Sequence, residues 1–223
     1  MSKQQKSNQF TNNGTEILED AYSLETPNDN REYYKQIASE YDKNFAEELG
    51  YIYPEEIGKL LLKSEKSISG AICDIGCGTG LVGEWLIGQK ETVPIDGIDI
   101  SDEMLKVAKE KAIYRNLYNE DLTKSCYAFP RNYGALISSG TFTHGHLGPE
   151  PIGRLIMHCR SGALCFLGVN KTHYKKLKFD IFIKNLITQK KIRNFCVTEV
   201  KIYQNIAGSY AKDRASICTF EVC

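Results

Sequence analysis

The sequence predicts an α/β domain with a mainly parallel sheet and helices on both faces. Three observations predict this class. Short apolar segments of strand length, AICDI (71–75) and ALCFLGV (163–169), alternate with helical segments such as 81–89. A glycine-rich loop joins 71–75 to the helix at 81–89. The chain has 223 residues, 42% of them hydrophobic and 25% charged, which is enough for one domain with its own core.

The first part of the chain is polar, and we expect residues 1–27 to be a disordered tail. Residues 28–223 are then expected to form a single domain. Its first helices, at about 31–63, have apolar faces, and the second of them begins near Pro54. The apolar face of the first helix is formed by Tyr34, Ile37, Tyr41 and Phe45.

The later elements follow in alternation. We expect further strands at 94–100, near 121, at 134–140, at 194–203 and at 215–222, and further helices from Ser101, at 151–159 and at 174–189. The last two strands alternate apolar and polar residues, which is typical of an antiparallel pair. Ligands of such sheets bind beyond the carboxyl ends of the strands, so we expect a site built from those loops and the N-terminal helices.

Composition and patterning exclude several classes of protein. The longest apolar stretch, 162–169, is too short to cross a bilayer, and residues 1–15 lack the apolar segment of a secretory signal. The eight cysteines form no CxxC pair, so we expect no metal site and a reduced cytoplasmic setting. The formal net charge is zero, which makes nucleic acid an unlikely partner.

The charges are nevertheless unevenly distributed. Residues 16–56 carry 12 acids and 3 bases, whereas residues 171–193 carry 8 bases and 1 acid. Such a contrast can steer a charged substrate, although a run of charges is more often only a solvated helix face.

The strongest functional signal is the loop CDIGCGTG at 73–80, between a strand and a helix. Alternate glycines let the backbone approach a ligand closely, and the helix that follows presents free N–H groups. Asp99 ends the next strand, where a carboxylate can bind two ribose hydroxyls, and Asp121 with Leu122 follows one strand later, placed to contact an adenine ring. Packing alone does not explain two acids at strand ends.

A dinucleotide fold is the alternative for this loop, because residues 78–83 match GxGxxG and Asp99 lies about 20 residues further on. The register argues against it. The first glycine after the strand is Gly76, and the third glycine position counted from there is Leu81. Asp74 would also place a carboxylate near a pyrophosphate, whereas it suits the ammonium group of an amino-acid tail. The loop therefore favours a nucleoside that carries an amino acid.

With these motifs the sequence resembles the class I S-adenosylmethionine-dependent methyltransferases, over roughly residues 31–223. It resembles most the small enzymes related to the Williams–Beuren-region methyltransferase-like proteins, through segments 33–42, 138–150 and 169–174. The resemblance implies a Rossmann-like fold with a seven-stranded, mainly parallel sheet and an antiparallel C-terminal strand. It departs from the family at 159–163, where Cys-Arg-Ser-Gly-Ala replaces the usual Pro-Gly-Gly turn.

The resemblance also implies roles for individual residues, with S-adenosylmethionine as the cofactor. The implied cofactor-binding residues are Asp74, Gly76, Cys77, Gly78, Gly80, Asp99, Ile100, Met104, Asp121, Leu122, Ser138 and Tyr41. Tyr34 and Thr141 are implied near the substrate, with Tyr34 and Tyr41 closing over the site. Tyrosines at helical spacing are more often part of the core, and this alternative stays open.

His144 and His146 are the candidate catalytic residues, because they follow a predicted strand on the ligand side of the sheet and histidine titrates near neutrality. A His-x-His pair in a glycine-bounded loop can equally just hold that loop. Two histidines without a third ligand are weak evidence for a metal.

The sequence thus predicts an enzyme that transfers a methyl group to a small-molecule acceptor. One alternative is a methyltransferase acting on RNA or protein, with 171–193 as its docking surface. A non-catalytic cofactor-binding subunit and a nicotinamide-dependent dehydrogenase are the others. The acceptor and the oligomeric state are not predicted.

Overall fold

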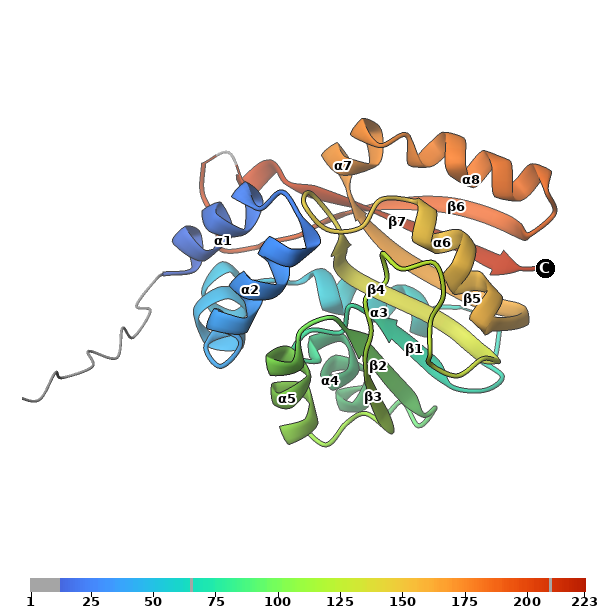
Figure 1. Cartoon of the computed structure of the whole chain (residues 1–223), viewed down its shortest axis with the longest axis horizontal. Helices are drawn as coiled ribbons and strands as arrows, with labels where there is room; N and C mark the ends of the chain where they lie inside the picture. Colours follow the sequence, from blue (N-terminus) through green and yellow to red (C-terminus); the bar gives the residue numbers. More distant parts are fainter. Residues whose placement is uncertain (1–12, 65, 209) are drawn as a thin grey trace, which may run out of the picture.

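The computed structural model describes residues 13–64, 66–208 and 210–223, which form a seven-stranded sheet covered by helices (Figure 1). The strand order is β3-β2-β1-β4-β5-β7-β6. The first five strands are parallel, and β7 runs antiparallel between β5 and β6. The predicted α/β class, the seven strands and the antiparallel C-terminal strand are therefore confirmed. Because the chain returns from β3 to pair β4 with β1, the strand order reverses between these two strands, which is where ligands bind in such sheets.

Most elements lie where the sequence pattern predicts them, but the helix expected at 151–159 is shorter, because Cys159 already belongs to the next strand. The strands are β1 (Ile72–Ile75), β2 (Ile95–Asp99), β3 (Asn116–Asn119), β4 (Tyr133–Phe142), β5 (Cys159–Asn170), β6 (Ile192–Lys201) and β7 (Arg214–Val222). The helices are α1 (Gly14–Ser23), α2 (Pro27–Ile37), α3 (Tyr53–Leu62), α4 (Leu81–Gly88), α5 (Asp102–Glu110), α6 (Glu150–Leu155), α7 (Lys171–Lys176) and α8 (Phe179–Thr188). The other helical segments are the π-helix η1 (Tyr41–Glu47) and the 3₁₀ turns η2 (Ile156–His158) and η3 (Tyr210–Lys212).

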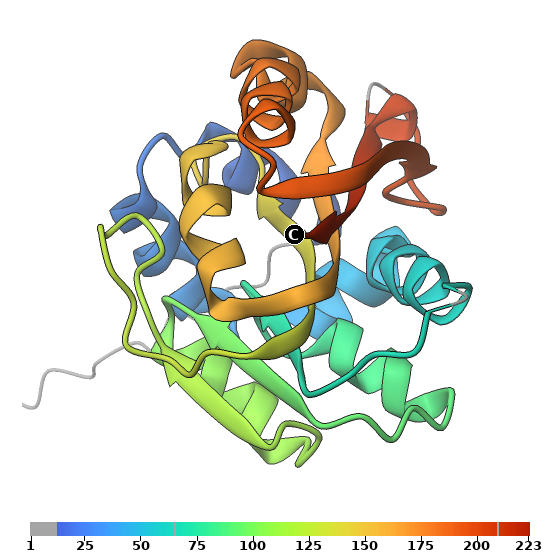
Figure 2. The ribbon, with the colours of Figure 1, turned by 90° about the vertical axis from the view of Figure 1, so that its right-hand side faces the viewer.

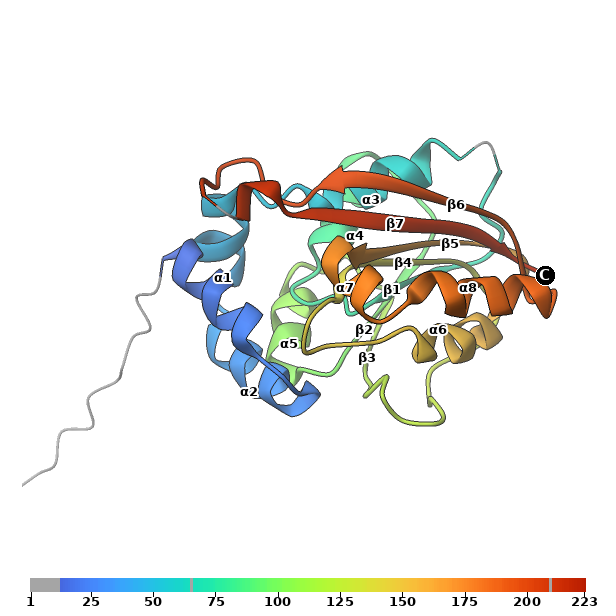
Figure 3. The ribbon, with the colours of Figure 1, turned by 90° about the horizontal axis from the view of Figure 1, so that it is seen from above.

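The sheet is buried on both faces, and each face has its own hydrophobic core. Alternate residues of β1 divide between them: Ile72 belongs to the core that packs against α3, α4 and α5, whereas Cys73 and Ile75 belong to the core that packs against α6 and α8. Figures 2 and 3 show these two helical layers on either side of the strands. The alternation follows from the two-residue period of a β-strand.

The N-terminal segment differs from the sequence prediction. The prediction of a disordered tail over 1–27 is wrong for residues 14–23, which form α1, while residues 1–12 lie outside the described residues. Asn13 caps α1, accepting a hydrogen bond from the Glu16 N–H while the Glu16 side chain accepts one from the Asn13 N–H. Ile17 and Leu18 then bury the inner face of α1. Two apolar residues and a capping box are enough to fix this otherwise polar helix.

Two predicted helices are interrupted. The helix expected over Tyr34–Phe45 divides into α2 and the wider turn η1, and the helix expected at 174–189 divides into α7 and α8. The second break lies at Lys178, whose φ of 54° is left-handed. No glycine or proline marks that break in the sequence, so its position could not be read from local residue types.

The described helices include none that is both long and apolar enough to span a lipid bilayer.

Candidate active site

A cavity of about 140 Å³ lies beyond the carboxyl ends of β1, β2 and β4. Its floor is the loop between β1 and α4, and its roof comes from α2 and η1. This is the point where the strand order reverses, as the sequence prediction required. The predicted residues that line it are Tyr34, Tyr41, Gly76, Cys77, Gly78, Asp99, Ile100, Met104, Asp121, Leu122, Thr141 and His146.

The glycine loop is shaped by backbone that only glycine adopts easily. Gly76 and Gly78 have φ values of 64° and 54°. A Cβ at Gly76 would lie 1.9 Å from the Thr141 hydroxyl, so no larger residue fits there. A Cβ at Gly78 would meet no atom within 4 Å, because this residue faces the open space of the cavity. The loop thus packs tightly against β4 on one side and leaves room for a ligand on the other.

Two hydroxyl groups of β4 hold the loop in place. The Ser138 and Thr141 hydroxyls donate hydrogen bonds to the Ile75 carbonyl oxygen at 2.8 and 2.9 Å. Thr141 also lines the cavity, whereas Ser138 is fully buried behind it. The role that the resemblance implies for Ser138 is therefore confined, in this geometry, to fixing the loop.

Asp99 lies at the end of β2 and connects the two loops that follow β1 and β2. One carboxylate oxygen accepts a hydrogen bond from the Gly78 N–H at 2.9 Å, and the other accepts one from the Ser101 N–H at 2.9 Å. Burial raises the pKa of this carboxyl group, and the backbone N–H groups oppose that rise by stabilising the charge. Ser101 then caps α5 by accepting from the Met104 N–H, as predicted.

Asp74 lies behind the glycine loop and not in the cavity wall. Its side chain is fully buried, and one oxygen accepts a hydrogen bond of 2.7 Å from the Tyr114 hydroxyl. The other oxygen has no hydrogen-bond partner. Burial raises the pKa of Asp74 to about 7. Gly80, also outside the wall, makes room for Tyr114, whose ring would lie 2.9 Å from a Cβ at that position.

The opposite end of the cavity is apolar with an acidic edge. Met104 and Leu122 are buried side chains of this wall, and Ile100 lies beside them. One Asp121 oxygen accepts hydrogen bonds from the N–H and the hydroxyl of Thr123, at 2.9 and 2.6 Å. This arrangement offers a flat apolar surface with a fixed carboxylate at its edge.

An ion pair holds the N-terminal segment down on the glycine loop. Asp42 of η1 accepts a hydrogen bond of 2.5 Å from the Thr79 hydroxyl and pairs with Lys111 at 2.7 Å. Lys111 also contacts Glu84 of α4 at 2.6 Å. Tyr41, next to Asp42, thereby lies over the cavity, and the Tyr34 ring packs edge-on against it with centroids 6.0 Å apart. Both tyrosines line the cavity and also pack in the core.

The two candidate histidines are placed differently. His146 lines the cavity, where its ring packs edge-on against Tyr34 with centroids 5.6 Å apart. Burial, together with the nearby His173 and His144, lowers the pKa of His146 to about 4, so it is neutral at physiological pH. His144 is exposed and does not line the cavity. The His173 Nε2–H donates a hydrogen bond of 2.9 Å to the Leu147 carbonyl oxygen and holds the loop.

Asn30, Arg31 and Tyr51 are among the cavity residues that were not predicted from the sequence. The Asn30 amide donates hydrogen bonds to Thr26 O and Gly145 O at 2.8 and 2.7 Å, which joins α2 to the histidine loop. Arg31 is the one cationic side chain among the described residues of the wall. Helical spacing could have identified Arg31, because it lies one turn from Pro27 and one turn from the predicted site residue Tyr34 and therefore shares their face of α2.

The basic segment 171–193 does not contribute to this wall. It comprises α7, α8 and the start of β6, and none of its described residues lines the cavity. Lys171 instead pairs with Glu199 of β6.

Comparisons with known proteins agree with this geometry. Residues 72–161 match a family described as a methyltransferase domain. The chain is 32% identical over 91 residues to malonyl-[acyl-carrier protein] O-methyltransferase 2 of Ilyobacter polytropus, a match that covers 40% of this chain and about a third (34%) of that protein.

Solved structures extend the likeness in fold to nearly the whole chain. The magnesium protoporphyrin IX methyltransferase of Synechocystis PCC 6803, solved with S-adenosylhomocysteine, is 16% identical with a TM-score of 0.58, and the match covers 95% of this chain and 100% of that one. The plantazolicin methyltransferase BpumL, solved with the same compound, is 13% identical with a TM-score of 0.56, over 93% and 94% of the two chains. The narrower resemblance to Williams–Beuren-region proteins stays a prediction.

Proposed function

We propose that this chain is a class I S-adenosylmethionine-dependent methyltransferase and that it transfers the methyl group of that cofactor to a small-molecule acceptor; the matched methyltransferase domain and the fold support this. The proposal depends above all on the hydrogen bond between the Gly78 N–H and the Asp99 carboxylate, because it joins the strand-end acid to the glycine loop. This contact lies where the strand order of the sheet reverses. A strand-end carboxylate beside an open, left-handed glycine suits a ribose next to an amino-acid arm better than it suits a pyrophosphate.

The residues of the wall fit each part of this cofactor. Asp99 would accept hydrogen bonds from the ribose hydroxyls, and Met104 with Leu122 would cover the adenine ring while Asp121 meets its amino edge. Gly76 and Gly78 would line the amino-acid arm, since a Cβ at Gly78 would enter the open space of the cavity. The buried Asp74 carboxyl group, whose second oxygen has no hydrogen-bond partner, lies behind the loop and would favour an ammonium group at this end of the site through its charge.

When bound, the cofactor supplies a sulfonium methyl group that is already activated toward a nucleophile. The chain then has to orient the acceptor and exclude water. Tyr34 and Tyr41 would do the latter from the roof. His146, being neutral, would accept a hydrogen bond from the acceptor and orient it, whereas a pKa of about 4 makes it a weak general base. His144, exposed outside the wall, would take no direct part.

Two features support a small acceptor. The cavity is roofed by α2 and η1, which leaves little room for a folded protein or an RNA helix. The basic segment 171–193, which the RNA or protein alternative needs as a docking surface, is absent from the described wall. Acceptors named for the similar proteins are a malonyl group on a carrier protein, a porphyrin and plantazolicin, so they differ too much to select one here.

Isothermal titration calorimetry tests this proposal. S-adenosylhomocysteine should bind the wild-type protein at one site, and Asp99→Ala should weaken binding about 10- to 100-fold, because the ribose hydroxyls lose a charged acceptor worth about 1.5–3 kcal/mol. Asp180→Ala, on the exposed start of α8, is the control and should leave the affinity unchanged. Binding of NAD⁺ in place of S-adenosylhomocysteine would establish the dehydrogenase alternative and exclude this one.

A further inference from the structure

A second hollow, of about 50 Å³, adjoins the proposed cofactor cavity. The two share the wall residues Tyr34, Tyr41, Tyr51, Gly140 and His146. Beyond that shared wall the hollow extends under α1 and toward the end of β6, away from the adenine end of the cofactor cavity. We call it the aromatic hollow. Gly140, at the end of β4, lines both cavities, and it precedes Thr141, which the resemblance places near the substrate.

The wall of the aromatic hollow is built from interlocked rings. Tyr41 stacks on Phe45 with centroids 4.8 Å apart, and Phe45 packs edge-on against Tyr51 at 5.4 Å. Tyr51 packs in turn on Tyr203 at 5.6 Å. The rings come from η1, from the segment before α3 and from the chain after β6, so three separate parts of the chain fix them against one another. Rings held in this way present faces and edges on which another flat ring packs well.

The described lining of the aromatic hollow contains no acidic, lysine or arginine side chain. His146 is neutral because burial lowers its pKa to about 4, and burial raises the pKa of Tyr51 above its ordinary value. The Asn170 side-chain oxygen already accepts from two N–H groups at the start of α7. A charged acceptor would therefore lose its water without gaining an oppositely charged partner.

The position of the hollow also disfavours a cation. Aromatic faces attract cations, but an acceptor in this hollow would lie next to the positively charged sulfonium group on the other side of the shared wall. None of the acids of the cofactor cavity (Asp99, Glu120 and Asp121) belongs to the hollow. Repulsion between the two positive charges would then act without compensation.

We propose that the aromatic hollow is the acceptor site and that it takes a neutral, flat, single-ring molecule whose hydroxyl group points to His146 at the shared wall. This inference rests on the proposed function. In the reaction a C–O bond forms to the acceptor oxygen as the C–S bond breaks, and the electron pair of that bond goes to sulfur. The hydroxyl proton, which is hydrogen-bonded to His146 before the reaction, ends on water. The structure thus assigns α1, which was expected to be disordered, as part of the acceptor site.

Three single-ring probes of similar size but different charge test the assignment: 4-methylphenol, 4-methylbenzoate and 4-methylbenzylammonium. Each is titrated by calorimetry into protein saturated with S-adenosylhomocysteine. We expect the neutral phenol to bind at least tenfold more tightly than either charged probe, and 4-methylanisole to form when S-adenosylmethionine replaces the product. No phenol binding, or equal or tighter binding of a charged probe, would overturn the assignment.

A variant whose added side chain fills the aromatic hollow tests whether the phenol binds there. Ala21 of α1 is buried and lines the hollow but not the cofactor cavity, so Ala21→Phe should abolish phenol binding and leave the affinity for S-adenosylhomocysteine unchanged. Glu19→Phe adds the same ring to the exposed side of α1 and should change neither. Ala21→Val is the smaller filler if the Phe variant does not fold. If a folded Ala21 variant binds the phenol as tightly as the wild-type protein does, the inference is contradicted. If the wild-type protein does not bind S-adenosylhomocysteine, the proposed function itself is contradicted.

Discussion

Two aspartates on neighbouring strands have opposite surroundings, although both side chains are fully buried. Asp96, near the start of β2, accepts hydrogen bonds from Arg115, from Asn116 and from the Tyr133 hydroxyl. Asp74, near the end of β1, accepts one hydrogen bond from Tyr114, and its second oxygen has no partner. Burial opposes the charge of both, but the partners of Asp96 lower its pKa, whereas the pKa of Asp74 rises to about 7.

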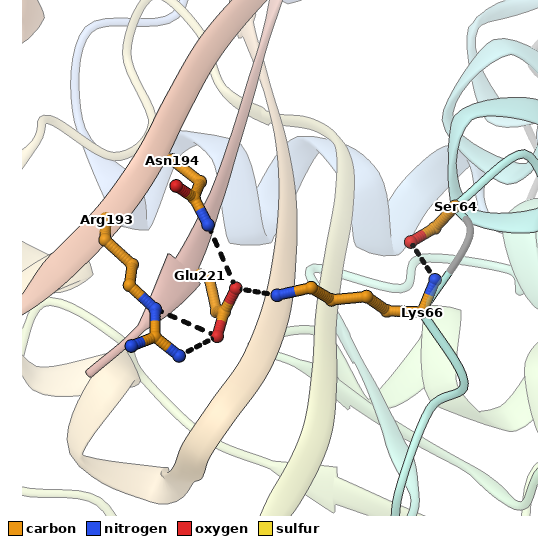
Figure 4. Close-up of polar contacts among 5 residues, drawn as sticks. All are labelled: Ser64, Lys66, Arg193, Asn194 and Glu221. Carbon is orange, nitrogen blue, oxygen red and sulfur yellow. Dashed lines mark hydrogen bonds and ion pairs between the residues drawn. The ribbon is translucent and has the colours of Figure 1, made fainter.

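The comparison of Asp96 with Asp74 distinguishes the two ends of the sheet: buried acids stabilise the fold at one end, and a buried acid without all its partners lies beside the proposed ligand site at the other. At the amino ends of the parallel strands, the buried carboxylate of Asp96 has all its partners within the chain. A second example there is Glu221 of β7, whose side chain is 4% exposed and contacts Lys66, Arg193 and Asn194 (Figure 4). At the carboxyl ends, by contrast, Asp74 keeps an oxygen free at a cost in stability. A buried polar atom without a hydrogen-bond partner is an exception in folded proteins and is typical of a site where a ligand supplies the missing partner.

The largest expected effect is at Asp96. Asp96→Asn replaces charged hydrogen bonds by weaker ones around a buried position, so we expect the free energy of unfolding to fall by about 2–4 kcal/mol. Urea denaturation measures this loss. The matched control Asp180→Asn, on an exposed helix, should cost well under 1 kcal/mol. The affinity of the folded variant for S-adenosylhomocysteine should be unchanged, and a loss of affinity as large as that of Asp99→Ala would break the comparison.

For Asp74→Asn we expect the opposite of Asp96→Asn: a loss of ligand affinity without a loss of stability. Because the folded protein binds the Asp74 proton more tightly than the unfolded chain does, wild-type stability should fall as pH rises from about 3.8 to about 7, and Asp74→Asn should remove this part of the decline. The variant is expected to be as stable as the wild-type protein or more so at pH 8, while its affinity for S-adenosylmethionine falls about tenfold.

Urea denaturation of the ligand-free proteins between pH 4 and 8 and calorimetry at pH 8 measure the two parts of this prediction. If Asp74→Asn destabilised the protein at pH 8 as much as Asp96→Asn does, Asp74 would be structural and the comparison would fail.

A smaller effect is expected at Glu221. Its partners Lys66 and Arg193 are about half exposed, so solvent screens the pairs, and we expect Glu221→Gln to lower Tm by only about 2–4 °C. Arg193 and Lys66 lower the pKa of Glu221 to about 2, so its contribution is fully present above about 4.5 and is lost as the pH falls toward 2. Thermal scans at pH 7 and pH 3 should therefore show a smaller difference between variant and wild type at pH 3. An equal difference at both pH values would show that the charge of Glu221 is not what matters.

The sequence predicted the parts of the fold that depend on local patterns. The strands β1, β4 and β5 contain apolar runs, and the glycine loop with Asp99 follows from residue types at fixed spacing. The prediction of a tail considered only the polar composition of this segment and did not use the capping pair Asn13 and Glu16 that the structure shows. Packing of Ile17 and Leu18 on distant parts of the chain decides this helix, and a local pattern does not contain such contacts.

The candidate site also depends on tertiary contacts that a local sequence pattern does not contain. His144 and His146 are equivalent in the sequence, and the turn at Gly145, with φ of 73°, decides that only His146 faces the cavity. Tyr51 lies between helices with no motif around it, yet it lines both the cofactor cavity and the aromatic hollow. Side chains brought together by tertiary packing leave no spacing that a sequence pattern could reveal.

The most direct measurement is a crystal structure of the protein soaked with S-adenosylhomocysteine. The account predicts the ribose hydroxyls at Asp99, the adenine against Leu122 and the amino-acid arm along Gly76 and Gly78. A molecule bound elsewhere, or a diphosphate preferred at Gly76 in a parallel soak with NAD⁺, would contradict it.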